Sequence, residues 1–218
     1  MNIIIFGPPG AGKGTQSDKI VKKYKLFKVS TGDLLRDEIN KKTQLGKEIK
    51  EIVDSGKLVS DKIINRLIEK VIADERYKNN IIFDGYPRNL EQAENLKNLL
   101  KKFNQKIDLV ISLEVSLDSI VKRITGRLVC SKCGNTYNEF FNPPPSRLTC
   151  CKDGNLKKRS DDNVETAKKR YLTYQTSTEP VLDYYKKFGL LENISGENKI
   201  DEISNKIADF INLIRGWL

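Results

Sequence analysis

The first fifteen residues constrain the fold more than any other part of the chain. Four apolar residues at positions 3–6 precede the glycine-rich run of residues 7–15, and an amphipathic segment continues to residue 25. Glycines let successive backbone N–H groups point into one concavity, and the amino end of a helix adds positive potential. The spacing Gly7-x4-Gly12-Lys13 therefore predicts a loop that wraps a phosphate chain between a strand and a helix, with Lys13 at the β and γ oxygens.

The residue after the lysine departs from the usual form of this loop. A Ser or Thr normally follows the lysine directly, and its hydroxyl binds Mg²⁺. Here Gly14 intervenes before Thr15, which argues against direct binding of the metal by a hydroxyl. Asp84 ends the apolar run 81–83, and a carboxylate at the carboxyl end of a strand is well placed to hold hydrated magnesium. We therefore expect Asp84 to anchor Mg²⁺ through water.

Short apolar runs alternate with longer amphipathic segments, a pattern typical of βα units and a parallel sheet. The fold class that we predict is α/β, a five-stranded parallel sheet of the P-loop NTPase kind with helices on both faces. The expected strands are residues 2–6, 27–30, 80–84, 108–114 and 190–194. The expected helices are residues 13–25, 61–73, 90–103, 117–125, 164–188 and 201–213.

Two segments interrupt this alternation, in a chain of 218 residues that is long enough for one α/β domain with small inserts. Residues 30–59 follow the second strand and have helical character. Residues 126–163 contain four cysteines and three consecutive prolines, with few periodic positions. We therefore expect a core of residues 1–29, 60–125 and 164–218, a helical insert and a small inserted subdomain.

Composition excludes several classes of function. The chain has no histidine, so a mechanism with a histidine base, nucleophile or metal ligand is impossible. Its 39 Lys and Arg against 29 Asp and Glu give a net charge of +10, which favours acidic partners, either nucleotides or nucleic acids. No apolar run approaches the ~20 residues of a membrane helix, and four apolar residues near the start are too few for a signal peptide. We expect a cytoplasmic protein without a membrane partner.

The cysteines have the spacing of a zinc ribbon. Cys130-x2-Cys133 is followed, after sixteen residues, by Cys150-x2-Asp153, and two short-spaced ligand pairs at such a separation are typical of structural zinc. Asp153 replaces the commoner cysteine, but carboxylate oxygen also binds zinc. Cys151 would be the third ligand in place of Cys150 if the second ligand pair began one residue later. A disulfide or free thiols are the other interpretations, and a cytosolic location argues against the disulfide.

Several ordered motifs resemble those of nucleoside monophosphate kinases, and of the adenylate kinase family in particular. The Lys-Gly-Thr form of the phosphate loop is the first of them. The others are residues 30–36 (STGDLLR), 56–61 (GKLVSD), 84–88 (DGYPR) with Gln92, 123–127 (RITGR), and 159–162 (RSDD) with Arg170. The matches extend from residue 3 to about residue 198 in family order. The cysteine segment resembles the zinc-bearing lid of the long bacterial form of this family. By the same resemblance, the helical insert of residues 30–59 is expected to bind AMP.

The resemblance implies roles for particular residues. Arginine forks match phosphate oxygens in bidentate fashion, and six of the ten arginines lie in these motifs. Expected catalytic residues are Lys13, Arg88, Arg123, Arg159 and Arg170. Expected ATP-binding residues are Gly10, Ala11, Gly12, Lys13, Gly14, Thr15, Arg123, Arg127, Thr136, Tyr137 and Asn198. Expected AMP-binding residues are Thr31, Arg36, Lys57, Leu58, Val59, Gly85, Tyr86, Pro87, Arg88, Gln92, Arg159 and Arg170. Asp33, Asp161 and Asp162 are expected to orient arginines and hinge contacts.

The activity implied by the resemblance is reversible transfer of a phosphoryl group from Mg·ATP to AMP, giving two ADP, by direct in-line transfer in a monomer. An alternative is a related kinase that uses another nucleotide as substrate, either a GTP:AMP phosphotransferase or a pyrimidine monophosphate kinase. A basic zinc-ribbon protein that binds nucleic acid is a more distant one, favoured by the charge and the cysteines. The insert lacks the interleaved aromatic residues that stack bases, apart from Tyr137, Phe140 and Phe141, so no nucleic acid partner is expected.

Overall fold

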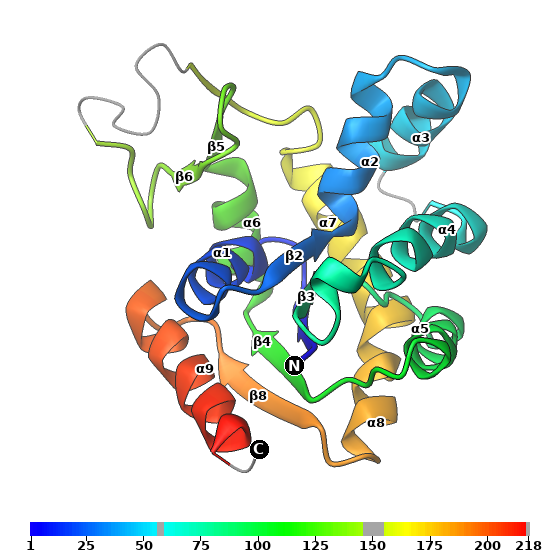
Figure 1. Ribbon diagram of the computed structural model, residues 1–218. Helices are drawn as coiled ribbons and strands as arrows, with labels where there is room; N and C mark the ends of the chain where they lie inside the picture. Colours follow the sequence, from blue (N-terminus) through cyan, green and yellow to red (C-terminus); the bar gives the residue numbers. More distant parts are fainter. Residues whose placement is uncertain (56–58, 146–154, 217–218) are drawn as a thin grey trace.

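A five-stranded parallel sheet forms the centre of the protein in the computed structural model, which describes residues 1–55, 59–145 and 155–216 (Figure 1). The strands are β1 (Ile3–Phe6), β2 (Phe27–Ser30), β3 (Ile81–Asp84), β4 (Leu109–Glu114) and β8 (Leu191–Ser195). Their order across the sheet is β2-β3-β1-β4-β8. Ile3 at the start of β1 pairs with Ile82 on one side and Leu109 on the other. The predicted sheet is confirmed, with boundaries shifted by one residue in four strands.

The central strands are apolar without alternation because both faces of the sheet are covered. All four residues of β1 are buried, and their side chains alternate between two clusters. Ile4 and Phe6 belong to a core on one face, whereas Ile3 and Ile5 belong to a core on the other. This burial on both sides holds the carboxyl end of β1, and therefore the loop that follows it, in a fixed position.

Helices cover the two faces. One face carries α1 (Lys13–Tyr24) and α9 (Ile200–Arg215), whose apolar residues join the core of Ile3 and Ile5. The other face carries α4 (Asp61–Ile72), α5 (Leu90–Lys102) and the α8 helix (Glu179–Lys186). A shorter α6 (Leu117–Thr125) packs on α7 (Val164–Thr173) through Ile120, Ile124 and Ala167. A 3₁₀ turn at Glu75–Tyr77 precedes β3.

The helix expected over residues 164–188 is helical without a break from Val164 to Lys186, but it is not α-helical throughout. The segment consists of α7, a π-helical turn at Tyr174–Thr178 (η2) and α8. Pro180 lies in the first turn of α8, where it lacks an N–H and its ring would collide with the carbonyl of Thr176 in a regular α-helix. A turn of the i→i+5 type takes in one more residue and avoids that collision.

Two smaller units extend from the carboxyl edge of the sheet (Figure 1). The first consists of α2 (Thr31–Asn40) and α3 (Gln44–Asp54), whose first turns are capped by the side chains of Ser30 and Thr43. The second is an antiparallel sheet in the order β6-β5-β7, built from Thr136–Asn138, Arg127–Cys130 and Leu156–Lys157. Both coincide with the segments that interrupt the βα pattern, although the exact domain boundaries stay a prediction.

Across the ranges that the structure describes, no helix combines the length and apolar character that a membrane span requires.

Candidate active site

The loop after β1 has the backbone of a phosphate cradle. Gly10 and Gly12 have positive φ values of 81° and 99°, a region that L-residues with a Cβ rarely adopt. Gly12 directly precedes the first residue of α1, so the amino end of that helix opens toward the loop. At Gly7 a Cβ would come within 2.9 Å of the Leu113 carbonyl oxygen, which explains glycine there by the close approach of two backbones.

Lys13 lies inside this loop and holds it closed. Its Nζ donates hydrogen bonds to the carbonyl oxygens of Gly7 at 2.7 Å and Pro8 at 2.9 Å. Burial lowers the pKa of Lys13 to about 8; Asp84 opposes this, whereas Arg88 and other arginines reinforce it. The ammonium group therefore begins to lose its proton not far above neutral pH. A bound polyanion would reduce the repulsion between this group and the neighbouring arginines.

Asp84 is available for a cation. It ends β3, and its Oδ2 lies 3.7 Å from the place that a Cβ on Gly14 would occupy. Among the described residues its carboxylate has no hydrogen bond or ion pair. Burial raises the pKa of Asp84, while Lys13 and Lys28 act against that rise. A buried carboxylate with this environment beside the loop fits a hydrated divalent cation.

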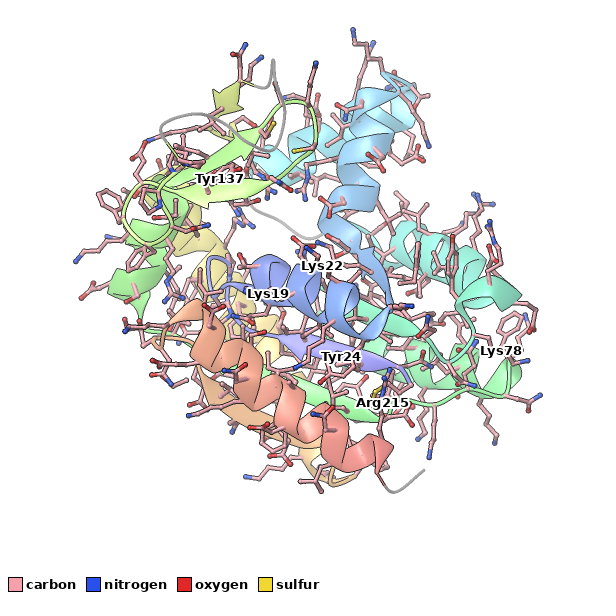
Figure 2. The ribbon with its side chains drawn as sticks, turned by 60° about the vertical axis from the view of Figure 1, so that its left-hand side comes forward. Lys19, Lys22, Tyr24, Lys78, Tyr137 and Arg215 are labelled. Carbon is pink, nitrogen blue, oxygen red and sulfur yellow. The ribbon has the colours of Figure 1, made fainter. Side chains whose placement is uncertain are left out.

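Both smaller units and the sheet edge meet at one cavity of about 540 Å³. Of the residues predicted for the site, the following line it: Gly10, Ala11, Gly12, Lys13, Gly14, Thr15, Arg36, Val59, Asp84, Gly85, Pro87, Arg88, Arg123, Arg127, Thr136, Tyr137, Arg159, Arg170 and Asn198. They come from positions between 10 and 198, so only the tertiary fold brings them together. Figure 2 shows Tyr137 on the small antiparallel sheet, apart from the α1 lysines Lys19 and Lys22.

Arg88 is held by its own turn. Its peptide N–H donates to Gln92 Oε1 at 2.7 Å, and its Nε donates to the Gly85 carbonyl at 2.8 Å. Burial lowers the pKa of Arg88 to about 10, and the neighbouring Arg170 contributes in the same direction. Its guanidinium group is therefore charged at neutral pH and faces the cavity in a fixed direction.

Carboxylates orient three of the other arginines, as the sequence predicted. Arg170 donates to Asp161 at 2.6 Å, and Arg127 donates through Nε to Asp162 at 2.9 Å. Arg36 pairs with Asp33 on α2. These pairs confirm the expected role of the three aspartates and leave further N–H donors of each guanidinium unused by the pair.

Arg159 differs from these arginines. Within the described part of the chain its side chain forms no hydrogen bond and no ion pair. Burial lowers the pKa of Arg159 to about 10; Arg127 and Arg36 reinforce this, whereas Asp162 and Asp161 oppose it. Within the described residues the arginine cluster therefore has one cation in the cavity without a direct ion pair, which favours an anionic ligand there.

The structure also places two residues in the cavity wall, Glu197 and Phe141, that the sequence analysis did not assign to the site. Arg123 donates to the carbonyl oxygens of Ala11 at 3.3 Å and Gly196 at 2.8 Å, and lies 3.7 Å from Glu197. Glu197 also accepts hydrogen bonds from the amide and hydroxyl of Ser116 at the start of α6. The Arg123 guanidinium lies 5.2 Å from the ring centre of Phe141. A glutamate after a strand and an exposed aromatic residue gave no sequence signal strong enough to identify them.

Three predicted residues lie beneath the cavity surface instead of lining it. Tyr86 is 1% exposed, and its hydroxyl donates to Asn65 Oδ1 at 2.8 Å. Gln92 uses its amide oxygen for Arg88 and donates from Nε2 to Asp61 at 2.6 Å. Thr31 donates to the Gly85 carbonyl at 2.8 Å. In this conformation these three side chains support the turn at residues 85–88, so contact with a nucleotide stays a prediction for each.

The predicted zinc ligands are described only in part. Cys130 is buried at the end of β5, and Cys133 is exposed in the turn that follows. The Gly134 N–H donates to the Cys130 carbonyl at 3.0 Å and closes that turn. Cys150, Cys151 and Asp153 lie outside the described residues, as do Lys57 and Leu58 of the predicted AMP site. Among the described residues no group of three or more His, Cys, Asp or Glu side chains is arranged for a metal, so zinc stays a prediction.

Comparison with known proteins agrees with this arrangement. A model of the adenylate kinase family matches residues 5–190. The chain is 52% identical to an adenylate kinase of Pelagibacter ubique over 213 residues, covering 98% of this chain and all of the relative. This chain belongs to the adenylate kinase family. It is also 42% identical to an adenylate kinase of Staphylococcus epidermidis (97% and 99% covered) and 43% to one of Thermodesulfovibrio yellowstonii (95% and 97%). The predicted enzyme class, a nucleoside monophosphate kinase, is confirmed.

Proposed function

We propose that the protein catalyses the reversible reaction Mg·ATP + AMP ⇌ 2 ADP by direct in-line transfer, without a covalent intermediate. The observation that carries this proposal is that one cavity is lined both by the phosphate loop and by the arginines Arg36, Arg88, Arg159 and Arg170. Phosphoryl transfer requires positioning and charge stabilisation rather than covalent catalysis. The acceptor phosphate is already anionic near neutral pH, so the absence of histidine is compatible with the reaction.

The proposed roles follow from the position of each cation. Lys13 and the loop amides bind the ATP phosphates, together with Arg123 and Arg127. Arg36 and Arg88 bind the AMP phosphate. Arg159 and Arg170 stabilise the charge on the group in transfer. A planar guanidinium can bind two phosphate oxygens at once, which explains arginine instead of lysine at these positions.

The nucleoside ends of the two substrates have separate proposed contacts. Thr136, Tyr137 and Asn198 line the cavity and are the proposed contacts of the ATP nucleoside. On the AMP side the proposed contacts are Thr31, residues 57–59, residues 85–87 and Gln92. Closure of the small sheet over the nucleotides would expel water, which is the competing acceptor.

Magnesium belongs to the ATP side of the proposal. Asp84 would hold the hydrated ion beside the loop, because it lies at the end of β3 next to Gly14 and its carboxylate has no ion pair among the described residues. The ion supplies positive charge that offsets the phosphate oxygens of ATP. We propose a monomer because one chain completes the cavity; a cytoplasmic location stays a prediction.

The test of the proposed function is a coupled assay for ADP. Wild-type protein is assayed with each pairing of ATP or GTP as donor and AMP, CMP or UMP as acceptor, with and without magnesium. We expect the highest kcat/KM for ATP with AMP, and loss of turnover when magnesium is chelated. A preference for GTP or for a pyrimidine acceptor would assign the chain to another nucleoside monophosphate kinase activity.

The pH dependence of kcat/KM for ATP should follow the ionisation of Lys13. Because burial lowers the pKa of this lysine to about 8, the free enzyme loses the ammonium charge as pH rises through that value. We expect kcat/KM for ATP to fall above about pH 8, since this parameter follows ionisations of the free enzyme. The Lys13→Arg variant, whose charge persists, should lack this alkaline fall even if its rate is lower. A flat wild-type profile to about pH 9.5 would contradict the assignment.

We also propose that the lid carries structural zinc on Cys130, Cys133, Cys150 and Asp153. Support comes from the ligand spacing and from the turn between Cys130 and Gly134. A closed site of four ligands would stabilise a subdomain whose β-strands are two to four residues long.

Chelation or Cys130→Ser should therefore lower the melting temperature by several degrees while changing kcat less than about three-fold. Elemental analysis should find one zinc per chain. Comparison of Cys150→Ser with Cys151→Ser identifies the third ligand, because only the ligand variant should lose metal. Purified protein without any bound metal would refute the zinc site.

A further inference from the structure

Thr178, the last residue of the π-helical turn, is hydrogen-bonded to Arg88. It is 7% exposed and lies at the end of η2, where its Oγ1 donates a hydrogen bond of 2.9 Å to the Arg88 carbonyl oxygen. The two residues are 90 positions apart in the sequence. Thr178 also lines the cavity, on the same helical segment as Arg170.

This contact completes a clamp on the two peptide groups that flank the Arg88 Cα. The Arg88 N–H is bound by Gln92 Oε1 at 2.7 Å, and the Arg88 carbonyl is bound by Thr178. The Nε of the same residue donates to the Gly85 carbonyl at 2.8 Å. The Nη2 of Arg88 also donates a long hydrogen bond of 3.5 Å to Thr31 Oγ1. The backbone and the guanidinium of Arg88, which lines the cavity, are therefore both held in place.

The π-helical turn explains why a hydroxyl from this helix reaches Arg88. A turn of the i→i+5 type includes one residue more than an α turn, so it shifts the phase of the side chains that follow. Thr178 consequently stays on the cavity side together with Arg170 and Tyr174. The same turn is where Pro180 interrupts the regular helix, so the break in the helix has a consequence for the site.

We propose that Thr178 is a positioning residue that orients Arg88 toward the phosphate of AMP. The inference rests on the proposed function, in which Arg88 binds that phosphate. In this role Thr178 acts through the Arg88 carbonyl, to which its hydroxyl donates. Loss of its hydroxyl leaves a carbonyl oxygen without its donor and frees the peptide to rotate, which moves the guanidinium away from the acceptor phosphate.

The test compares three variants of the full chain. Thr178→Val keeps the branched shape and removes the hydroxyl, whereas Thr178→Ser keeps the hydroxyl. Thr176→Val is the matched control, because its hydroxyl donates to the Leu172 carbonyl at 3.0 Å in the same turn but is exposed. Steady-state kinetics are measured with AMP varied at saturating ATP and with ATP varied at saturating AMP, alongside melting temperatures.

We expect Thr178→Val to lower kcat/KM for AMP about ten-fold while changing kcat/KM for ATP less than about two-fold. Thr178→Ser should restore the value for AMP, and Thr176→Val should match wild type. If Thr178→Val is unfolded, Thr178→Ala carries the same expectation. Equal losses for both substrates, or a lower melting temperature with unchanged kinetics, would overturn the inference alone. A wild-type protein inactive toward AMP would overturn the proposed function as well.

Discussion

Replacement of Lys13 by methionine should lower kcat/KM for ATP by on the order of 10³-fold, because it removes the point charge that the loop holds at the β and γ phosphates. The same change should not lower the melting temperature of the unliganded protein. Burial lowers the pKa of Lys13 from 10.5 to about 8, so keeping the charged group in the folded state is unfavourable at neutral pH. Steady-state kinetics and a thermal melt measure both effects on one sample.

Lys22→Met is the matched control for this experiment. Lys22 lies on the same helix but is exposed (Figure 2), and among the described residues it has no ion pair. Its replacement should leave kcat/KM within about two-fold of wild type, as expected for an exposed site. Normal turnover by Lys13→Met would remove the lysine from the mechanism, whereas equal losses in both variants would indicate a general charge effect.

Arg88→Ala should have the second largest effect, a loss of about 10²–10³-fold in kcat/KM for AMP. The variant removes a cation between the two phosphate chains, and it also leaves the Gly85 carbonyl without the Nε donor at 2.8 Å. Arg88→Lys should recover little of this loss, because an ammonium group lacks the planar fork. Varying AMP at saturating ATP separates a higher KM from a lower kcat.

Arg76→Ala provides the control for Arg88. The Arg76 side chain is 77% exposed and pairs with Asp74 away from the cavity. Exposed ion pairs contribute about 0–1 kcal/mol to stability, so neither activity nor melting temperature should change appreciably. If Arg88→Ala retained wild-type kcat/KM for AMP, the assignment of the acceptor side of the cavity would be wrong.

Local patterns predicted the loop, the strands and most helices because their causes lie within a few residues. The glycines at 10 and 12 permit the positive φ values of the loop, and the apolar runs of β1 and β3 reflect burial on both faces. Periodicity predicted the long helix after residue 164 but not its π-helical turn, where Pro180 changes the helix type without changing the amphipathic pattern.

The chemistry of the site was predictable by residue type, but its geometry was not. Arginines at family spacing indicated phosphate binding, yet nothing in the sequence distinguishes Arg170, which pairs with Asp161, from Arg159, which has no ion pair among the described residues. Likewise Gln92 has the amide expected of a base-binding residue, and the fold directs that amide to Arg88 and Asp61. Side-chain direction depends on neighbours that are distant in sequence.

The sequence by itself determined the phosphate loop, the parallel sheet and the cationic character of the site, because backbone freedom, apolar periodicity and charge are properties of neighbouring residues. The tertiary structure alone decided which groups meet: the Thr178 hydroxyl with the Arg88 carbonyl, and Glu197 with Arg123 and the start of α6. These contacts span about 75 to 90 residues along the chain. Their geometry is fixed when two elements pack on the same sheet, which no local pattern encodes.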